Sequence, residues 1–321
     1  MISFIVKKEE SGQTLEKYVR KILESAPTSF IYKLFRKKDV KVNGHWQDNK
    51  YVINEGEEIR IYVTDEQLEE FKTKKEVKAS KDISSWVIYE DSNILLINKP
   101  RGVLVQKDNS GDEALDDMVL SYLVSKREYD PDSLSAYKPA PAHRLDRNTA
   151  GIVVFGKNII ALRELSELLN YKTRVSKRYL TLVKGEIKED GEISVPLQKN
   201  AKNGRVYINE NGKPSLTRYK VVKNFDGYTL LEVELLTGRT HQIRVHMAYI
   251  NHPVIGDAKY GDYALNKEIE NKYGFKNQFL LAYLLKFKNI TGPLADLSNK
   301  SFTIDLPEEM NNLLLLLDKR S

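Results

Sequence analysis

The chain has 321 residues, with 51 Lys and Arg against 45 Asp and Glu, and its formal net charge is +6. It contains no cysteine, which excludes disulfides, thiol chemistry and cysteine-ligated metal sites. This length favours two domains, and the modest positive charge favours a polyanionic partner.

The first ten residues alternate Ile2, Phe4 and Val6 with polar side chains. This pattern is typical of a strand and lacks the apolar centre of a signal peptide. No stretch reaches the roughly 20 apolar residues of a membrane-spanning helix. We therefore expect a cytoplasmic protein with no membrane partner.

Residues 12–63 predict two helices and a small sheet. Thr14 can cap the first helix, which ends near Pro27, and the second helix begins at Thr28. Alternating apolar residues on either side of the Asn43-Gly44 turn and at 59–63 predict short strands. The second helix and the residues after it carry four outward-facing cations: Lys33, Arg36, Lys37 and Lys38. Charge alone allows either a solvated helix end or a phosphate-binding face.

Residues 65–82 mix charges of both signs and hold few apolar residues, so we predict a charged linker there. The linker would join a first domain over residues 1–64 to a larger one over residues 83–321. In the larger domain, alternating strands joined by short turns outnumber helices. This pattern predicts an α+β fold with a mixed, mostly antiparallel sheet.

Two stretches of the larger domain place charged residues directly beside apolar runs. Asp146 lies between Arg144 and Arg147 and precedes the strand-like run 152–155, and residues 236–246 surround Ile243 with polar and charged side chains. An isolated Asp between two arginines is most often an exposed ion pair on a turn. The second stretch indicates a strand-to-helix junction that lines a site.

The order of these residues is informative. His-Arg-Leu-Asp-x-x-Thr-x-Gly, at residues 143–151, resembles the catalytic signature of the RNA pseudouridine synthases. Residues 99–106, 236–246, 256–261 and 279–287 match further motifs of that family in the same order. The chain most resembles the branch that includes the ribosomal large subunit synthases C and D, and the C type within it. Residues 12–44 resemble the αL, or S-four, RNA-binding domain, whose second helix presents its basic face to RNA phosphates.

The resemblance implies that uridine in RNA is converted to pseudouridine, without oxidation or phosphate transfer, so that no cofactor and no metal is needed. Asp146 would be the essential carboxylate, either attacking the sugar or removing a proton from it. Arg244 would pair with Asp146, keep it ionised and fix its direction. Tyr179 would stack on the target base and help to move a proton. Arg144 would fill the place of the extruded nucleotide.

Structural alternatives remain for several of these residues. Arg244 could satisfy a structural carboxylate from an apolar strand, and Tyr179 could be a core tyrosine with a bonded hydroxyl. The histidines at 241 and 246 lack the Glu of a zinc-protease helix, so we predict no metal. His143 would orient the Asp146 loop by hydrogen bonding. The residues expected to shape the base pocket or to touch RNA are Arg239, His241 and Gln242.

The leading hypothesis is therefore isomerisation of uridine in large subunit (23S) ribosomal RNA by a monomeric enzyme that also meets pre-ribosomal particles. A transfer-RNA enzyme of the same family is a close alternative. A non-catalytic RNA-binding or ribosome-assembly protein is an alternative from another class. A glycosidic-bond hydrolase is a third, although its usual second carboxylate has no evident candidate.

Overall fold

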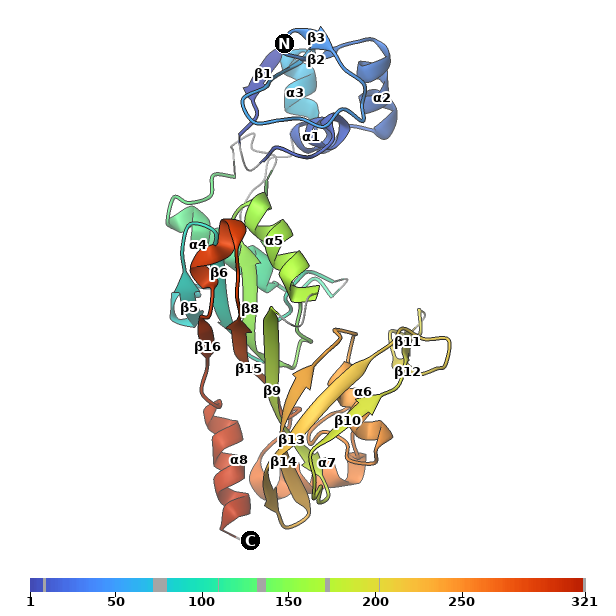
Figure 1. Ribbon diagram of the computed structural model, residues 1–321, viewed down its shortest axis with the longest axis vertical. Helices are drawn as coiled ribbons and strands as arrows, with labels where there is room; N and C mark the ends of the chain where they lie inside the picture. The colour runs from blue at the N-terminus through green and yellow to red at the C-terminus, as the bar shows by residue number, and fades with distance from the viewer. Residues whose placement is uncertain are drawn as a thin grey trace. The chain divides into compact units, whose positions relative to one another are not determined.

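The computed structural model describes residues 1–7, 10–71, 80–108, 110–131, 137–170, 174–201 and 203–319. The chain divides into two compact units (Figure 1). The first comprises Met1–Asp82, Asp117–Ala140 and Lys157–Ile160, and the second comprises Ile83–Asp116, Pro141–Gly156 and Ala161–Ser321. Within the predicted linker, residues 72–79 lie outside the described part of the chain.

The N-terminal part of the first unit is an antiparallel sheet with strand order β1-β4-β2-β3, together with three helices. The strands are β1 (Ile2–Ile5), β2 (Val40–Val42), β3 (His45–Trp46) and β4 (Glu58–Ile61), and the helices are α1 (Leu15–Ile22), α2 (Thr28–Arg36) and α3 (Asp65–Phe71). The two predicted helices and the small sheet are thus present. α3 is an additional helix inside the segment predicted as a linker.

Helical spacing and strand alternation explain this core. The hydroxyl of Thr14 accepts a hydrogen bond from the Lys17 N–H and caps α1. The buried face of α1 and the inward residues of β2 and β4 form one apolar cluster. Leu68 and Phe71 of α3 pack against the same cluster. Residues 65–71 therefore belong to the N-terminal core, and burial of these two side chains accounts for the helix in a segment that is otherwise highly charged.

The second unit is built on a long sheet with strand order β10-β13-β14-β9-β15-β8-β6-β5, in which β16 also pairs with β15 and β7 with β8. The first strands are β5 (Val87–Glu90), β6 (Ile94–Lys99), β7 (Ala140–Pro141), β8 (Ala150–Gly156) and β9 (Val175–Lys184). The later ones are β10 (Gly191–Ser194), β13 (Leu216–Phe225), β14 (Tyr228–Leu235), β15 (Leu280–Phe287) and β16 (Ser301–Thr303). Among the described pairings with printed registers, β8 with β15 is parallel and the others are antiparallel. The predicted α+β fold with a mixed, mostly antiparallel sheet is confirmed.

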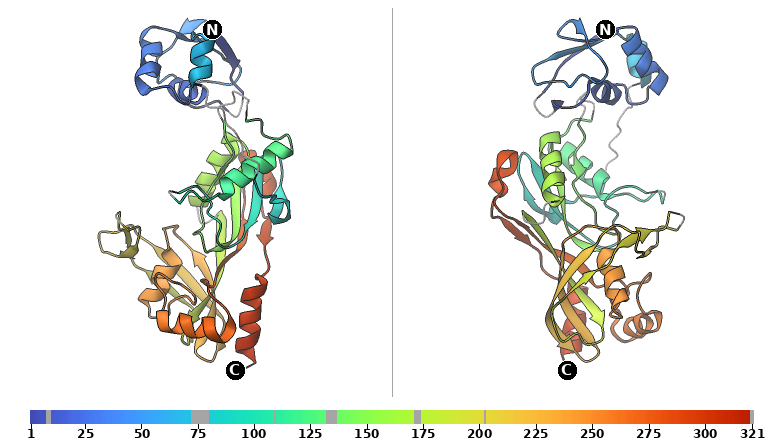
Figure 2. Two further views of the ribbon diagram at one scale, coloured as in Figure 1. Left: turned by 180° about the vertical axis from the view of Figure 1, so that it is seen from behind. Right: turned by 45° about the vertical axis from the view of Figure 1, so that its right-hand side comes forward.

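Helices flank this sheet and enclose two apolar clusters. Near β6, β8 and β15 lies α5 (Ile159–Asn170), with the 3-10 helix Gly292–Leu297. Near β9 and β14 lie α7 (Tyr263–Tyr273) and α8 (Glu308–Asp318), as Figure 2 shows. The remaining elements are α4 (Leu115–Ser125), α6 (Gln242–Tyr249), the 3-10 helix Ser84–Trp86 and the hairpin of β11 (Leu197–Lys199) and β12 (Val206–Ile208). None of the described helices is both long and apolar enough to cross a membrane.

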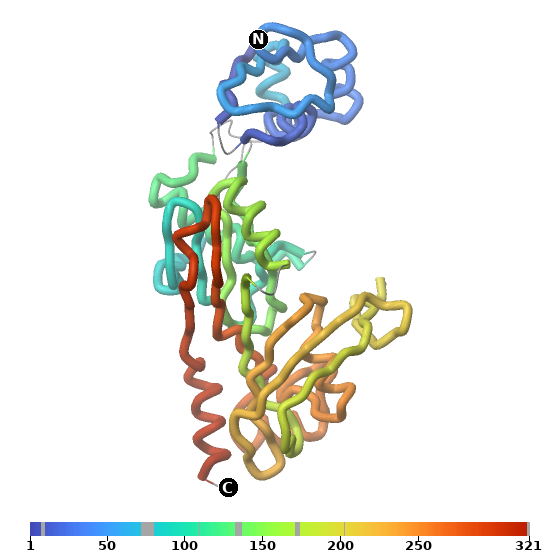
Figure 3. Tube along the Cα trace, in the orientation of Figure 1, coloured from blue at the N-terminus to red at the C-terminus, as the bar shows by residue number. Residues whose placement is uncertain are grey.

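The centre of the sheet brings distant parts of the chain together. β9 and β15, about a hundred residues apart in sequence, run side by side (Figure 3). On the other side of β15 lies β8, where Gly151 has φ +131°, and a Cβ there would lie 2.4 Å from the carbonyl oxygen of Ala282. Only glycine permits this approach. The start of β8 is therefore held against β15 directly after the loop that carries Asp146.

Candidate active site

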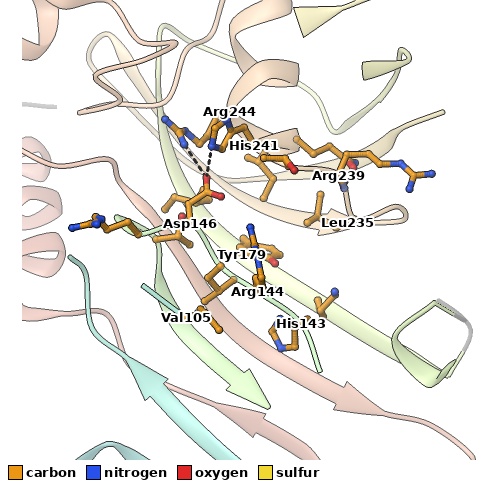
Figure 4. Close-up of a pocket in the computed structure, with 18 of the residues that line it drawn as sticks. Val105, His143, Arg144, Asp146, Tyr179, Leu235, Arg239, His241 and Arg244 are labelled. Atoms are coloured by element: carbon orange, nitrogen blue, oxygen red, sulfur yellow. Dashed lines mark hydrogen bonds and ion pairs between the residues drawn. The ribbon is translucent and has the colours of Figure 1, made fainter. Parts of the chain in front are cut away.

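The second unit contains an open pocket of about 870 Å³ (Figure 4). Its apolar part includes Val105, Leu145, Leu235, Ile243 and Leu280. Among the described residues that line it, seven are cationic and two are acidic. The cations are Lys107, Arg144, Arg147, Lys177, Lys199, Arg239 and Arg244, and the acids are Asp108 and Asp146. A pocket with an apolar part and a positive surround suits a flat ring attached to a polyanion.

Asp146 lies in the loop between β7 and β8, and this loop is fixed from several sides. The Thr149 N–H donates to the Asp146 carbonyl at 3.0 Å, which closes a turn. The buried Thr149 hydroxyl accepts from the Gln278 side chain at 2.6 Å. The Arg147 carbonyl accepts from the Gly102 N–H at 2.9 Å, and Gly102 has φ +82°. The turn at Gly102 therefore holds the Asp146 loop through the Arg147 backbone.

Lys99, at the end of β6, anchors the same loop. It is fully buried, and its Nζ donates to the carbonyls of Pro100 and Val103 at 2.9 Å and to that of Arg147 at 3.1 Å. Burial lowers the pKa of Lys99 to about 7, while the charge of Asp146 acts in the opposite direction. The family resemblance includes Lys99 in a motif, but the three carbonyls that it contacts could not be predicted from the motif.

The buried position of Lys99 predicts a specific pH dependence of stability. Its pKa is about 7 in the folded chain, and near 10.4 for an unperturbed lysine. Between these values the unfolded chain binds more protons, so stability rises with pH. We expect the free energy of unfolding of the wild type, minus that of Lys99→Met, to rise between about pH 7 and pH 10 in urea titrations.

Lys184→Met is the matched control for this experiment, because Lys184 is half-exposed in an ion pair with Asp262. Its difference from the wild type should stay flat over the same pH range. A flat difference for Lys99→Met as well would show that the ammonium of Lys99 does not lose its proton below the usual range.

Arg244 connects two carboxylates. It lies on α6, where its Nη1 donates to Asp146 at 2.8 Å, and its Nε and Nη2 donate to Asp257 at 2.6 and 2.9 Å. Burial by itself lowers the pKa of Arg244, but the two carboxylates outweigh burial and raise the pKa above its usual value. The guanidinium therefore stays charged. The alternative that placed Arg244 in an apolar strand is wrong, because residues 242–249 form a helix. The expected contact with Asp146 is present, yet the bidentate partner is Asp257.

Asp257 is the functional residue that sequence reasoning missed. Its side chain has no exposed surface, and it also accepts from the backbone N–H groups of Lys259 and Tyr260 at 2.8 and 3.1 Å. Burial by itself raises the pKa of Asp257, but Arg244 and these N–H groups outweigh it and hold the pKa below its usual value. Asp257 therefore fixes the direction in which Arg244 meets Asp146.

His241 lies near the same Asp146 oxygen as Arg244. The Val206 N–H donates to the Tyr260 hydroxyl at 2.8 Å, and that oxygen is 2.9 Å from His241 Nδ1. We assign the hydroxyl proton to Nδ1, because the other ring nitrogen, Nε2, faces the Asp146 carboxylate, which can only accept. This leaves the proton of His241 on Nε2, which is 3.8 Å from Asp146 Oδ2. Burial lowers the pKa of His241, so the ring is neutral near pH 7.

Tyr179 and Arg144 both line the pocket beside Asp146 (Figure 4). Tyr179, on β9, is 6% exposed. Burial, and then the charge of Asp146, raise the pKa of Tyr179, so its hydroxyl stays protonated. Arg144 is exposed. His143 Nε2 accepts from the Val154 N–H at 3.4 Å, so this histidine bonds to β8.

Two of the residues expected to touch RNA have other surroundings. Gln242 is 2% exposed, and its amide bonds to Thr237, to Thr217, to the Leu216 carbonyl and to the Arg239 N–H. Gln242 therefore joins the start of α6 to β13 instead of facing a ligand. Arg239 is exposed, points away from Asp146 (Figure 4) and donates to the Pro214 carbonyl at 3.1 Å.

The remaining predicted site residues lie outside this pocket. Lys33, Arg36, Lys37 and Lys38 are exposed on and just after α2 in the first unit. Within the described residues, no group of three or more His, Asp or Glu side chains is placed to hold a metal ion. What the pocket does hold is an oriented carboxylate beside a protonated tyrosine and a neutral histidine. Such a carboxylate can act on a bound ligand as a nucleophile or as a base.

Known proteins are similar to this chain in sequence and in fold. A family described as RNA pseudouridylate synthase matches residues 93–249. The chain is 34% identical over 285 residues to the Vibrio vulnificus protein named ribosomal large subunit pseudouridine synthase C, covering 88% of this chain and 87% of that one. It is 35% identical over 290 residues to the protein of the same name from Escherichia coli, covering 87% and 86%.

A solved structure agrees with the fold. Human RNA Pseudouridylate Synthase Domain Containing 4 matches with a TM-score of 0.59 at 21% identity, covering 74% of this chain and 94% of that one. At this identity, the match concerns the fold alone.

Proposed function

Because this chain belongs to the RNA pseudouridine synthase family, we propose that it converts uridine to pseudouridine in 23S ribosomal RNA. The observation that carries the proposal is the geometry of Asp146, which Arg244 orients toward a basic pocket large enough for an extruded nucleotide. The relatives named above act, by their names, on the ribosomal large subunit. We propose the same substrate for this chain.

The proposed reaction is an isomerisation that needs no external reagent. The bond from C1′ of the ribose to N1 of uracil breaks, the base turns within the pocket, and a bond from C1′ to C5 forms. The proton at C5 leaves and N1 gains one, so atoms and electrons balance. Asp146 supports cleavage either by attacking the sugar or by removing a proton from it. In both routes its carboxylate must face the ribose, and Arg244 provides that direction.

The pocket residues have distinct proposed roles. The ring of Tyr179 packs against the target base, and its protonated hydroxyl is available for proton movement. Arg144, exposed beside the pocket, fills the place that the flipped nucleotide leaves in the RNA. His143 steadies the chain before Asp146 through its bond to β8. Arg239, on the exposed rim, meets RNA phosphates.

His241 has a role that follows from its fixed tautomer. Its Nε2 lies 3.8 Å from the Asp146 oxygen that accepts from Arg244, so we propose that it stays beside the reacting carboxylate and donates to the ribose or to the base. Gln242 acts indirectly, by holding the start of α6 and thus the position of His241 and Arg244.

We also propose that residues 1–64 act as an S-four RNA-binding domain, joined by the segment 65–82 to a catalytic domain over residues 83–321. The exposed cations on and after α2 support this proposal, because they are free of the apolar core and reach solvent. Their contacts would be with phosphates, which gives affinity without a choice of sequence. The protein would work as a monomer on ribosomal RNA, including RNA in pre-ribosomal particles.

The test is a map of pseudouridine in ribosomal and transfer RNA from cells with and without the protein. Loss of discrete sites in 23S ribosomal RNA, restored by the wild-type gene, is the expected result. Loss of sites in transfer RNA alone would assign the protein to the transfer-RNA enzymes of the family. An unchanged map would overturn the proposal and favour a non-catalytic RNA-binding protein.

A further inference from the structure

The outer face of the N-terminal sheet exposes two aromatic rings. Trp46 on β3 is 45% exposed, and Tyr62, directly after β4, is 38% exposed. Lys41 on β2 lies opposite both Trp46 and Arg60, and residues opposite each other in a sheet share a face. Tyr62 follows Arg60 by two positions, and so continues the same face. The opposite face, which is apolar, is buried under the helices.

Cations accompany both rings. Lys38 Nζ lies 5.4 Å from the centre of the Trp46 ring, and Lys41 Nζ lies 5.0 Å from the centre of the Tyr62 ring. The Trp46 indole N–H donates to the Phe35 carbonyl at 3.4 Å, which fixes the ring. Of the two acidic residues that the alternation places on this face, Asp39 and Glu58, Glu58 bonds to Arg60 at 2.7 Å. The face therefore combines a fixed, exposed indole and an exposed tyrosine ring with a lysine beside each of them.

Exposed rings beside lysines favour one class of ligand, single-stranded nucleic acid. Exposed aromatic rings stack on nucleic acid bases, and nearby lysines meet the phosphates. Trp46 and Tyr62 lie on strands separated by β2, about 10 Å apart, whereas bases in a duplex rise by about 3.4 Å and hide their faces. Two rings at this separation fit unstacked bases and cannot stack within a duplex.

We propose that this outer face, formed by Lys38, Lys41, Trp46, Arg60 and Tyr62, binds unpaired nucleotides of RNA, with Trp46 stacked on a base. The inference rests on the proposed function in that it takes RNA as the ligand. Lys38 also belongs to the cations after α2, so the two surfaces are continuous. The α2 cations bind phosphates of any RNA, and the rings add a preference for single strands.

Trp46 provides its own spectroscopic probe. The chain has two tryptophans, so Trp86→Phe in the full-length protein leaves Trp46 as the sole emitter. We expect its fluorescence to be quenched by a short unpaired oligouridine or oligoadenosine, and not by an RNA duplex with the same number of phosphates. Trp46→Ala should weaken single-strand binding about 5- to 100-fold, with little change for the duplex, and Trp46→Phe should restore part of the loss.

Two matched variants define the controls. Tyr263→Ala removes a more exposed ring, 84% exposed, from the start of α7 and should leave single-strand binding unchanged. Lys41→Gln should weaken single-strand and duplex binding alike and reduce the salt slope by about one. Circular dichroism of each variant verifies that the chain remains folded.

Each outcome bears on one proposal. Equal quenching by duplex and single strand, or unchanged single-strand affinity in a folded Trp46→Ala variant, overturns the stacking surface. If that variant still forms pseudouridine in an RNA fragment at the wild-type rate, the proposed enzyme function is unaffected. Selective quenching in a protein that forms no pseudouridine would support the proposed binding surface and would overturn the proposed reaction.

Discussion

Asp146→Asn is expected to lower the single-turnover rate of pseudouridine formation by at least about 100-fold, and by up to about 10,000-fold, while RNA affinity stays within about threefold of wild type. The asparagine keeps an oxygen that can accept from Arg244 Nη1, so the loop between β7 and β8 should retain its shape. What it loses is the negative charge that attacks the sugar or takes a proton. Rapid-quench assays on a 23S fragment and filter binding measure the two quantities.

Asp108→Asn is the control for this experiment, because Asp108 is the other acidic residue among those that line the pocket in the described part of the chain. Its side chain is half-exposed and 3.8 Å from Arg147, so the variant should turn over nearly as wild type. Retained turnover in Asp146→Asn would show that another group performs the reaction. Loss of binding together with turnover would instead assign Asp146 to substrate recognition.

Local patterns predicted much of this fold because they depend on near neighbours. The helix cap at Thr14 and the turn at Asn43-Gly44 are properties of short segments. The packing of α3 could not be predicted from its charged sequence, because its two apolar anchors, Leu68 and Phe71, have their partners in the distant N-terminal core. Composition alone therefore reads such a segment as a linker.

The residues of the site could be predicted only where the order of the family motifs identified them. Asp146 and Arg244 are 98 positions apart and were paired through the family resemblance. Lys99 lies in a motif too, but its partners are backbone carbonyls, which no side-chain pattern reveals. Gln242 lines the pocket as expected, but its bonds to β13 could not be predicted, because they join residues about 25 positions apart.

Asp257→Asn is expected to lower the free energy of unfolding by about 3–5 kcal/mol and to reduce turnover sharply. The carboxylate accepts four N–H donors, two from Arg244 and two from the backbone. An asparagine must oppose its own NH₂ group to at least one of them, and it leaves Arg244 with Asp146 as its charged partner among the contacts described. Urea denaturation measures the stability, and single-turnover assays measure the rate.

The pH dependence of the stability difference shows whether Asp257→Asn destabilises the protein by removing the carboxylate charge. Because the folded pKa of Asp257 is depressed, its stabilising contribution is present above its unfolded pKa near 3.9 and disappears as pH falls through the folded value. The stability gap between wild type and Asp257→Asn should therefore narrow below about pH 4. Glu192→Gln, which breaks an exposed pair with Arg218, should cost about 1 kcal/mol or less. If Asp257→Asn costs no more than this control, the buried pair does not hold Arg244, and the direction of Asp146 must come from its own loop.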